Sequence, residues 1–152
     1  MLVRRPTLVV AALVIREGRI LLDRRKPGGT LGGLWEFPGG KVEPGETHAV
    51  ALRRELHEEL GVDANIGAEV RRLQFAYPDF DLELVLLRAD VTGEPRPLEV
   101  DKVGWFTVAE LGELSMPPAD LPLLADVRSI VEAEVGSKSP HYRDETKTGT
   151  GD

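Results

Sequence analysis

One stretch of the sequence, residues 39–62, limits the possible folds more than any other. It reads GGKVEPGETHAVALRRELHEELGV, in which glycine and proline come first and an uninterrupted run of helix-forming residues follows, up to Gly61. Ala, Leu, Glu and Arg favour helices, and glycine favours the position just after a helix. We therefore predict a glycine-rich loop over 38–45 and a helix over 47–60 that Gly61 ends.

The predicted helix carries a cluster of acidic side chains. Glu55, Glu58 and Glu59 are spaced i, i+3 and i+4, so they project from one side of the helix. Glu58 and Glu59 lie in the last turn, where the helix dipole disfavours anions, and Glu59 falls at the edge of the apolar stripe. A divalent cation would turn these unfavourable terms into favourable ones. The alternative is a solvated acidic face whose charges pair with Arg53 and Arg54.

Strand and helix patterns alternate along the rest of the chain. A secretory signal is the alternative for the apolar N-terminal run, but a buried hairpin explains this run better because no small-residue cleavage site follows. The mixture predicts an α/β (α+β) fold with a mixed β-sheet covered by helices. The expected elements are strands over 7–15 and 19–23, a short extended piece over 34–37, a hairpin of strands over 66–76 and 81–91, a strand over 103–106, a short helix with a Thr107/Glu110 capping box, and a helix from Asp120 to about 135.

Composition narrows the class of protein. The 152 residues suggest one domain over 1–135, followed by a polar tail over 136–152 that we expect to be disordered. The chain has no cysteine, which excludes disulfides and fits the cytoplasm. A net charge of −7 argues against binding to a nucleic-acid polymer, and no apolar run is long enough to cross a membrane.

The helix and the loop before it match a known motif. The chain fills every position of the Nudix box, G-x5-E-x7-R-E-U-x-E-E-x-G-U, a match expected by chance less than about once in a million. The chain therefore resembles the Nudix hydrolases, and the residues before the box (34–41), 77–79 and 117–120 resemble the MutT-type branch. The resemblance implies a Nudix-like α/β/α sandwich. The matching residues are Gly40, Glu46, Arg54, Glu55, Leu56, Glu58, Glu59, Gly61 and Val62.

The resemblance also implies an activity. Nudix hydrolases use divalent metal and water to cleave a diphosphate linked to another moiety. MutT-type enzymes convert nucleoside triphosphates to the monophosphate and pyrophosphate, so we expect hydrolysis of an oxidised guanine nucleotide such as 8-oxo-dGTP. A CTP or modified-dCTP pyrophosphatase is the alternative within the enzymes. A non-catalytic nucleotide-binding module is the alternative outside them, although an intact box argues against it.

Roles for the box residues follow from the same resemblance. Mg²⁺, or Mn²⁺, is the expected cofactor. Any of the glutamates could act as the general base. Glu46 and Arg54 are expected to form an ion pair that holds the loop against the helix, with Gly40 and Gly61 as structural glycines. The expected metal ligands are the Gly40 carbonyl and the side chains of Glu55, Glu58, Glu59 and Glu99, with Asp101 as the substitute for Glu99.

Four residues outside the box are candidates for substrate contact. Arg25 could clamp phosphate, or it could be a surface charge at the end of a strand. Tyr77 and Phe80 could stack on a base or simply pack in the hairpin. Asp120 could cap a helix or read the edge of a base, and an ionised aspartate only accepts hydrogen bonds. The sequence leaves open the number of metal ions, the preferred base and the oligomeric state.

Overall fold

Two sheets form the centre of the protein, of which the computed structural model describes residues 5–135; the tail predicted over 136–152 lies outside this range. In the first sheet β1 and β7 run parallel and the other pairs are antiparallel, so the sheet is mixed, as expected. Its order is β5 (Gly39–Lys41), β1 (Thr7–Leu13), β7 (Asp81–Thr92) and β6 (Asp63–Ala76).

The second sheet is antiparallel and is built around β3 (Arg19–Arg24). This strand pairs with β2 (Ile15–Arg16), β4 (Trp35–Glu36) and β8 (Lys102–Phe106). The helices are α1 (His48–Leu60), α2 (Val108–Leu111), the 3-10 turn η1 (Pro118–Asp120) and a C-terminal helix over 123–135.

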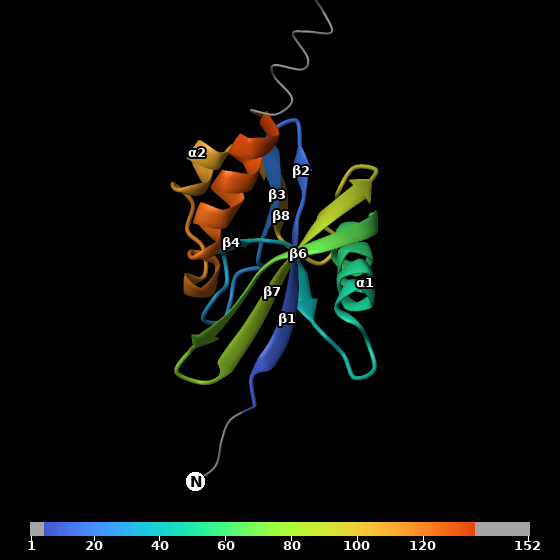
Figure 1. Ribbon diagram of the computed structural model, residues 1–152. Coiled ribbons are helices and arrows are strands. Elements are labelled where there is room, and N and C mark those ends of the chain that lie inside the picture. Colours follow the sequence, from blue (N-terminus) through green and yellow to red (C-terminus); the bar gives the residue numbers. More distant parts are fainter. Residues whose placement is uncertain (1–4, 136–152) are drawn as a thin grey trace, which may run out of the picture.

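Helices cover both faces of this central layer. Figure 1 shows α1 on one side of the strands and the C-terminal helix with α2 on the other. In β1, Val10 and Ala12 belong to the core beneath α1, whereas Ala11 and Leu13 belong to the core beneath the C-terminal helix. The predicted α/β/α sandwich with a mixed sheet is therefore confirmed. The helices contribute Ala51, Leu52, Leu56 and Leu60 to the first core and Leu123, Val127 and Val131 to the second.

Most predicted elements are present, but strand pairing differs at the N-terminus. The expected hairpin of 7–15 with 19–23 was only partly right, because β2 alone pairs with β3. β1 instead pairs with β5 and β7 in the other sheet. The hairpin of β6 and β7 and the Thr107/Glu110 capping box are confirmed.

The loop predicted over 38–45 was also partly wrong, since it contains β5. A Cβ at Gly39 would lie 1.9 Å from the carbonyl oxygen of Val10 in β1, so only glycine lets the two strands come this close. Gly39, which the sequence indicated as a break between elements, is instead required for the close pairing of β5 with β1. Within residues 5–135, no helix is long and apolar enough to span a membrane.

Candidate active site

A cleft of about 760 Å³ brings together residues that are far apart in the sequence. Gly40 and the carboxyls of Glu55 and Glu59 line one part of it. Other parts are lined by the loop over 28–32, the tip of the β6–β7 hairpin and the segment before the C-terminal helix, and β1 and β7 also contribute side chains. Of the residues predicted for the site, Glu58 and Glu99 do not line the cleft, whereas Gly40, Glu55, Glu59, Arg25, Tyr77, Phe80 and Asp120 do.

Helix α1 is fixed at both ends by the residues that its sequence predicted. The Thr47 side chain accepts a hydrogen bond from the Val50 amide at 3.1 Å, which caps the first turn. Gly61 adopts the left-handed conformation, with φ of 70°, and its amide donates to the His57 carbonyl. Its buried leucines anchor the helix to the sheet, so its acidic residues have a defined position beside the cleft.

Arg54 ties the loop to the helix, as predicted. Its Nε donates to Glu46 Oε2 at 2.6 Å, and its Nη2 donates to Glu46 Oε1 at 2.9 Å and to the Lys41 carbonyl at 3.0 Å. The hydrogen bonds from Arg54 lower the pKa of Glu46 to about 2. This bidentate pair holds the chain after β5 against α1.

Glu55 and Glu59 form a close carboxyl pair next to the backbone of Gly40. Their carboxyls are hydrogen-bonded to each other, and a Cβ at Gly40 would lie 2.3 Å from Cδ of Glu55. Burial raises the pKa of Glu59 to about 9, and burial also raises the pKa of Glu55. Arg54 Nη1 donates a hydrogen bond to Glu55 Oε2 at 3.1 Å, so the charge of Glu55 is partly compensated. Glu59 beside it still requires a proton or a further cation.

The other two predicted carboxylates are turned elsewhere. Glu58 is about half exposed and accepts a hydrogen bond from Arg54 Nη1 at 3.3 Å. Glu99 has an exposed side chain, although its amide donates to the Glu59 carbonyl at 3.3 Å, which brings its backbone to the end of α1. Asp101, the substitute for Glu99, accepts from Arg24 Nε at 2.9 Å.

The positions of these carboxyls determine which of them could bind a metal ion. Among the described residues, no group of three or more His, Asp or Glu side chains is arranged to hold a metal ion. The chemistry of the donors at Glu55 and Glu59 nevertheless fits a hard divalent cation, because both carboxyls have raised pKa values and that of Glu55 lies against the backbone of Gly40.

Aromatic side chains line the opposite part of the cleft. The rings of Tyr77 and Phe80 stack with centroids 5.1 Å apart, at the turn that joins β6 to β7. The Tyr77 hydroxyl accepts a hydrogen bond from the Ala119 amide at 3.1 Å, which fixes the hairpin tip against η1. Phe80 remains more exposed, so its ring offers a flat apolar surface to a ligand.

Asp120 is buried at the end of η1 and is not a helix cap. The predicted helix start at this residue was wrong, since the C-terminal helix begins at residue 123. Its carboxylate accepts a hydrogen bond from the Phe37 amide, and burial raises its pKa to about 7, with the charge of Glu36 as the next cause. Arg25 lies 3.4 Å from Glu36 across the same region.

Two further acidic residues belong to this region, and the sequence analysis missed both. Asp23 of β3 lies opposite Glu36 of β4, and burial raises their pKa values to about 8 and about 7. Glu36 lines the cleft, whereas Asp23 is completely buried. The signal was an aspartate inside the apolar run ILLD, which is rare in a strand core unless the carboxyl has a partner.

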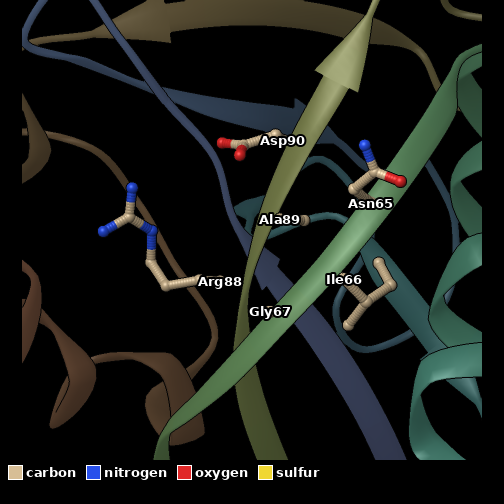
Figure 2. Close-up of a pocket in the computed structure, with 6 residues that line it drawn as sticks. All are labelled: Asn65, Ile66, Gly67, Arg88, Ala89 and Asp90. Carbon is tan, nitrogen blue, oxygen red and sulfur yellow. The ribbon is translucent and has the colours of Figure 1, made fainter.

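A second, smaller cavity of about 210 Å³ lies at a bulge between β6 and β7, where the register shifts after Ile66. In Figure 2, Arg88 and Asp90 extend away from Asn65 and Ile66, and Arg88 pairs with Glu134 of the C-terminal helix. The cavity shares no lining residue with the larger cleft. It therefore reflects an opened strand ladder rather than part of the site.

Comparisons with known proteins agree with this arrangement. The family model described as a NUDIX domain matches residues 10–126. A CTP pyrophosphohydrolase of Escherichia coli (strain K12) is 40% identical over 120 residues, which are 76% of this chain and 87% of the relative. An 8-oxo-dGTP diphosphatase of Haemophilus influenzae is 38% identical over 118 residues, which are 76% of this chain and 87% of the relative.

Solved structures show the same fold. The solution structure of the E. coli ORF135 protein has a TM-score of 0.76 and 37% identity, and the match covers 86% of this chain and 94% of that one. A MutT Nudix hydrolase from Burkholderia pseudomallei has a TM-score of 0.71 and 28% identity, covering 82% of this chain and 99% of that one. The chain therefore belongs to the Nudix hydrolase family, among enzymes of the MutT type.

Proposed function

We propose that the protein is a Mg²⁺-dependent pyrophosphohydrolase that converts a nucleoside triphosphate and water to the monophosphate and pyrophosphate. Its first candidate substrate is an oxidised guanine nucleotide such as 8-oxo-dGTP, whose removal from the cytoplasmic nucleotide pool protects DNA. The ligand is a free nucleotide rather than a nucleic-acid polymer, because a protein with a net charge of −7 lacks the broad basic surface that polymers require.

One observation carries the proposal: a single cleft is lined both by a carboxyl pair and by aromatic side chains. Glu55 and Glu59 are the carboxyl pair, Tyr77 and Phe80 are the aromatic residues, and Asp120 is part of the same lining. A triphosphate needs metal-binding carboxylates at its phosphates, and a base needs a flat apolar surface and polar groups at its edge. A nucleotide has both requirements within one molecule.

Nudix hydrolases generally use divalent metal ions. In this proposal the carboxylates of Glu55 and Glu59 and the Gly40 carbonyl would hold the ion. Glu58, in the last turn of α1, and Glu99, whose amide donates to the Glu59 carbonyl, would supply further carboxylates by turning their side chains toward it. Bound Mg²⁺ neutralises phosphate charge and lowers the pKa of the attacking water. Mn²⁺ fits the same oxygen donors.

The chain's own residues position the rest of the substrate. Arg54 acts indirectly, because its bonds to Glu46 and to the Lys41 carbonyl keep Gly40 close to α1. Arg25 lines the cleft next to Glu36 and is the proposed phosphate clamp. Phe80 stacks on the base, and Asp120 accepts hydrogen bonds from its edge.

CTP is the second candidate substrate. Glu36 and Asp120 both line the cleft, and carboxylates accept hydrogen bonds from an exocyclic amino group, which cytosine and guanine both carry. The similarity to a CTP pyrophosphohydrolase supports this candidate.

The experiment is a panel of triphosphates assayed for pyrophosphate release with and without Mg²⁺. The panel pairs each normal nucleotide with its oxidised form and includes CTP, dCTP and 8-oxo-dGTP. We expect Mg²⁺-dependent release, with the highest kcat/KM for 8-oxo-dGTP. Highest kcat/KM for CTP selects the second candidate, whereas binding of nucleotides without any hydrolysis would identify a non-catalytic module.

A further inference from the structure

Asp23 is a buried carboxyl that the proposed chemistry does not use. It lies directly opposite Glu36 in the antiparallel pair of β3 and β4, so the two side chains are on the same face of the sheet. Asp23 is 0% exposed and does not line the cleft, whereas Glu36 does. A ligand in the cleft would therefore meet Glu36, with Asp23 behind it.

The surroundings of Asp23 contain an acceptor but no donor. Among the described residues, neither of its carboxyl oxygens receives a hydrogen bond from an N–H or O–H group. The carboxyl opposite Asp23 in the strand pair is that of Glu36, and two adjacent carboxyls hydrogen-bond only when one of them is protonated. A proton must therefore lie between Asp23 and Glu36, because an ionised Asp23 would be buried without any partner.

The groups around the pair favour the proton on Asp23. Glu36 is exposed to the cleft and lies 3.4 Å from the Arg25 guanidinium, which stabilises its negative charge. Asp23 lies near the carboxyls of Glu36 and Asp120, and Arg25, which lowers the pKa of Asp23, has a smaller effect than burial and the charge of Glu36. Burial, the largest cause, raises the pKa of Asp23 to about 8, above that of Glu36.

We propose that Asp23 is a specificity-determining positioning residue, whose protonated carboxyl donates a hydrogen bond to Glu36 and holds Glu36 as an acceptor for an amino group on the nucleobase. The inference rests on the proposed function, since it takes the ligand to be a nucleotide. Glu36 and Asp120 then present two acceptors to the cleft. An exocyclic amino group has two N–H donors, whereas a carbonyl oxygen in its place would face two carboxylates.

Two substitutions separate the hydrogen bond from the volume of the side chain. Asp23→Asn keeps an N–H donor beside Glu36 without an ionisable proton. Asp23→Val fills a similar volume in the apolar strand and removes the donor. The valine variant has no buried polar atom to satisfy, so it is expected to fold, and its melting temperature checks this directly.

The readout is discrimination between bases that carry the exocyclic amino group and bases that lack it. The ratio of kcat/KM is measured for CTP against UTP and for dGTP against dITP. We expect Asp23→Asn to keep the wild-type ratios within about threefold and Asp23→Val to lower them at least about tenfold, mainly through KM. The Mg²⁺ dependence should not change in either variant. Wild-type ratios in Asp23→Val, or an equal loss in both variants, would overturn the proposal.

A second readout does not depend on activity. The infrared difference spectrum of wild type minus Asp23→Asn at neutral pH should contain the C=O stretching band of a protonated carboxyl. A carboxylate band in its place would overturn the inference even in an active enzyme. If the wild type hydrolyses no triphosphate, the proposed function fails separately, and the same base discrimination is then read from the Kd values.

Discussion

Glu59→Gln should stabilise the metal-free protein while abolishing its activity. Burial and the nearby charges of Asp23, Glu55 and Glu36 raise the pKa of Glu59 from 4.5 to about 9. A carboxyl with a raised pKa stabilises the fold fully below its unfolded value, and this contribution is lost as the pH rises toward about 9. Glutamine carries no ionisable proton, so the variant avoids this loss at neutral and alkaline pH.

The pKa shift of Glu59 determines how much stability Glu59→Gln can gain. One pKa unit corresponds to ~1.4 kcal/mol, so the interval from 4.5 to pH 8 sets an upper bound of ~5 kcal/mol for Glu59. Glu55 interacts with Glu59 and can change its own protonation in response. We therefore expect Glu59→Gln to raise the free energy of unfolding of the metal-free protein by ~1–3 kcal/mol at pH 8. For a chain of this size that stabilisation is a rise of ~3–10 °C in melting temperature.

In Mg²⁺ the wild type should melt at a higher temperature than Glu59→Gln, the reverse of the order expected without metal. The wild type gains RT ln(1 + [Mg²⁺]/Kd), which is ~2.7 kcal/mol at a hundredfold excess over Kd, and the variant gains much less. Turnover of the variant should fall at least ~10²-fold. The assay is thermal unfolding at pH 8 in EDTA and in Mg²⁺, with pyrophosphate release measured in parallel.

Glu132→Gln, at an exposed position of the C-terminal helix, is the matched control and should change neither the melting temperature nor the turnover. A Glu59→Gln variant that melts below the wild type in EDTA would refute the assignment of a buried, protonated carboxyl. A variant with near-normal turnover and a normal response to Mg²⁺ would refute the assignment of a metal ligand.

Three further variants test other parts of the site. Glu58→Gln should lower kcat at least ~10²-fold but barely change the melting temperature, because its side chain is about half exposed; normal kcat would remove it from the metal site. Asp120→Asn should abolish a rise in kcat/KM with pH through about 7, since Asp120 accepts with both oxygens and carries the negative charge that favours a base amino group only when ionised; an unchanged pH profile would contradict this. Arg54→Lys loses the bidentate pair with Glu46, so kcat should fall on the order of tenfold in a folded protein; full activity would show that the pair does not position Gly40.

The box helix and its ion pair were predictable because their determinants are local. Thr47 and Gly61 mark the ends of α1, and Glu46 and Arg54 are close enough in sequence for a loop and one helix to bring them together. For Glu58 the helical spacing allowed two interpretations, a metal ligand beside Glu55 or an ion pair with Arg54 one turn away, and the structure shows the ion pair.

Features that depend on distant strands were missed. Nothing near β1 in the sequence indicates that it pairs with β7, and glycines that looked like breaks form β5 against Val10. Asp23 and Glu36 were missed for the same reason, because their proximity follows from the register of β3 and β4. Local pattern likewise favoured Asp120 as a helix cap, whereas its partner is the Phe37 amide, a long-range contact.

The central claim is that the cleft hydrolyses a nucleoside triphosphate to the monophosphate and pyrophosphate. The most direct test is ³¹P NMR of the reaction products of wild type with 8-oxo-dGTP and with CTP, in the presence of Mg²⁺. The account predicts resonances of the nucleoside monophosphate and pyrophosphate, which appear with Mg²⁺ and are absent with Glu59→Gln. Release of orthophosphate and a nucleoside diphosphate, or no hydrolysis of any triphosphate, would contradict it.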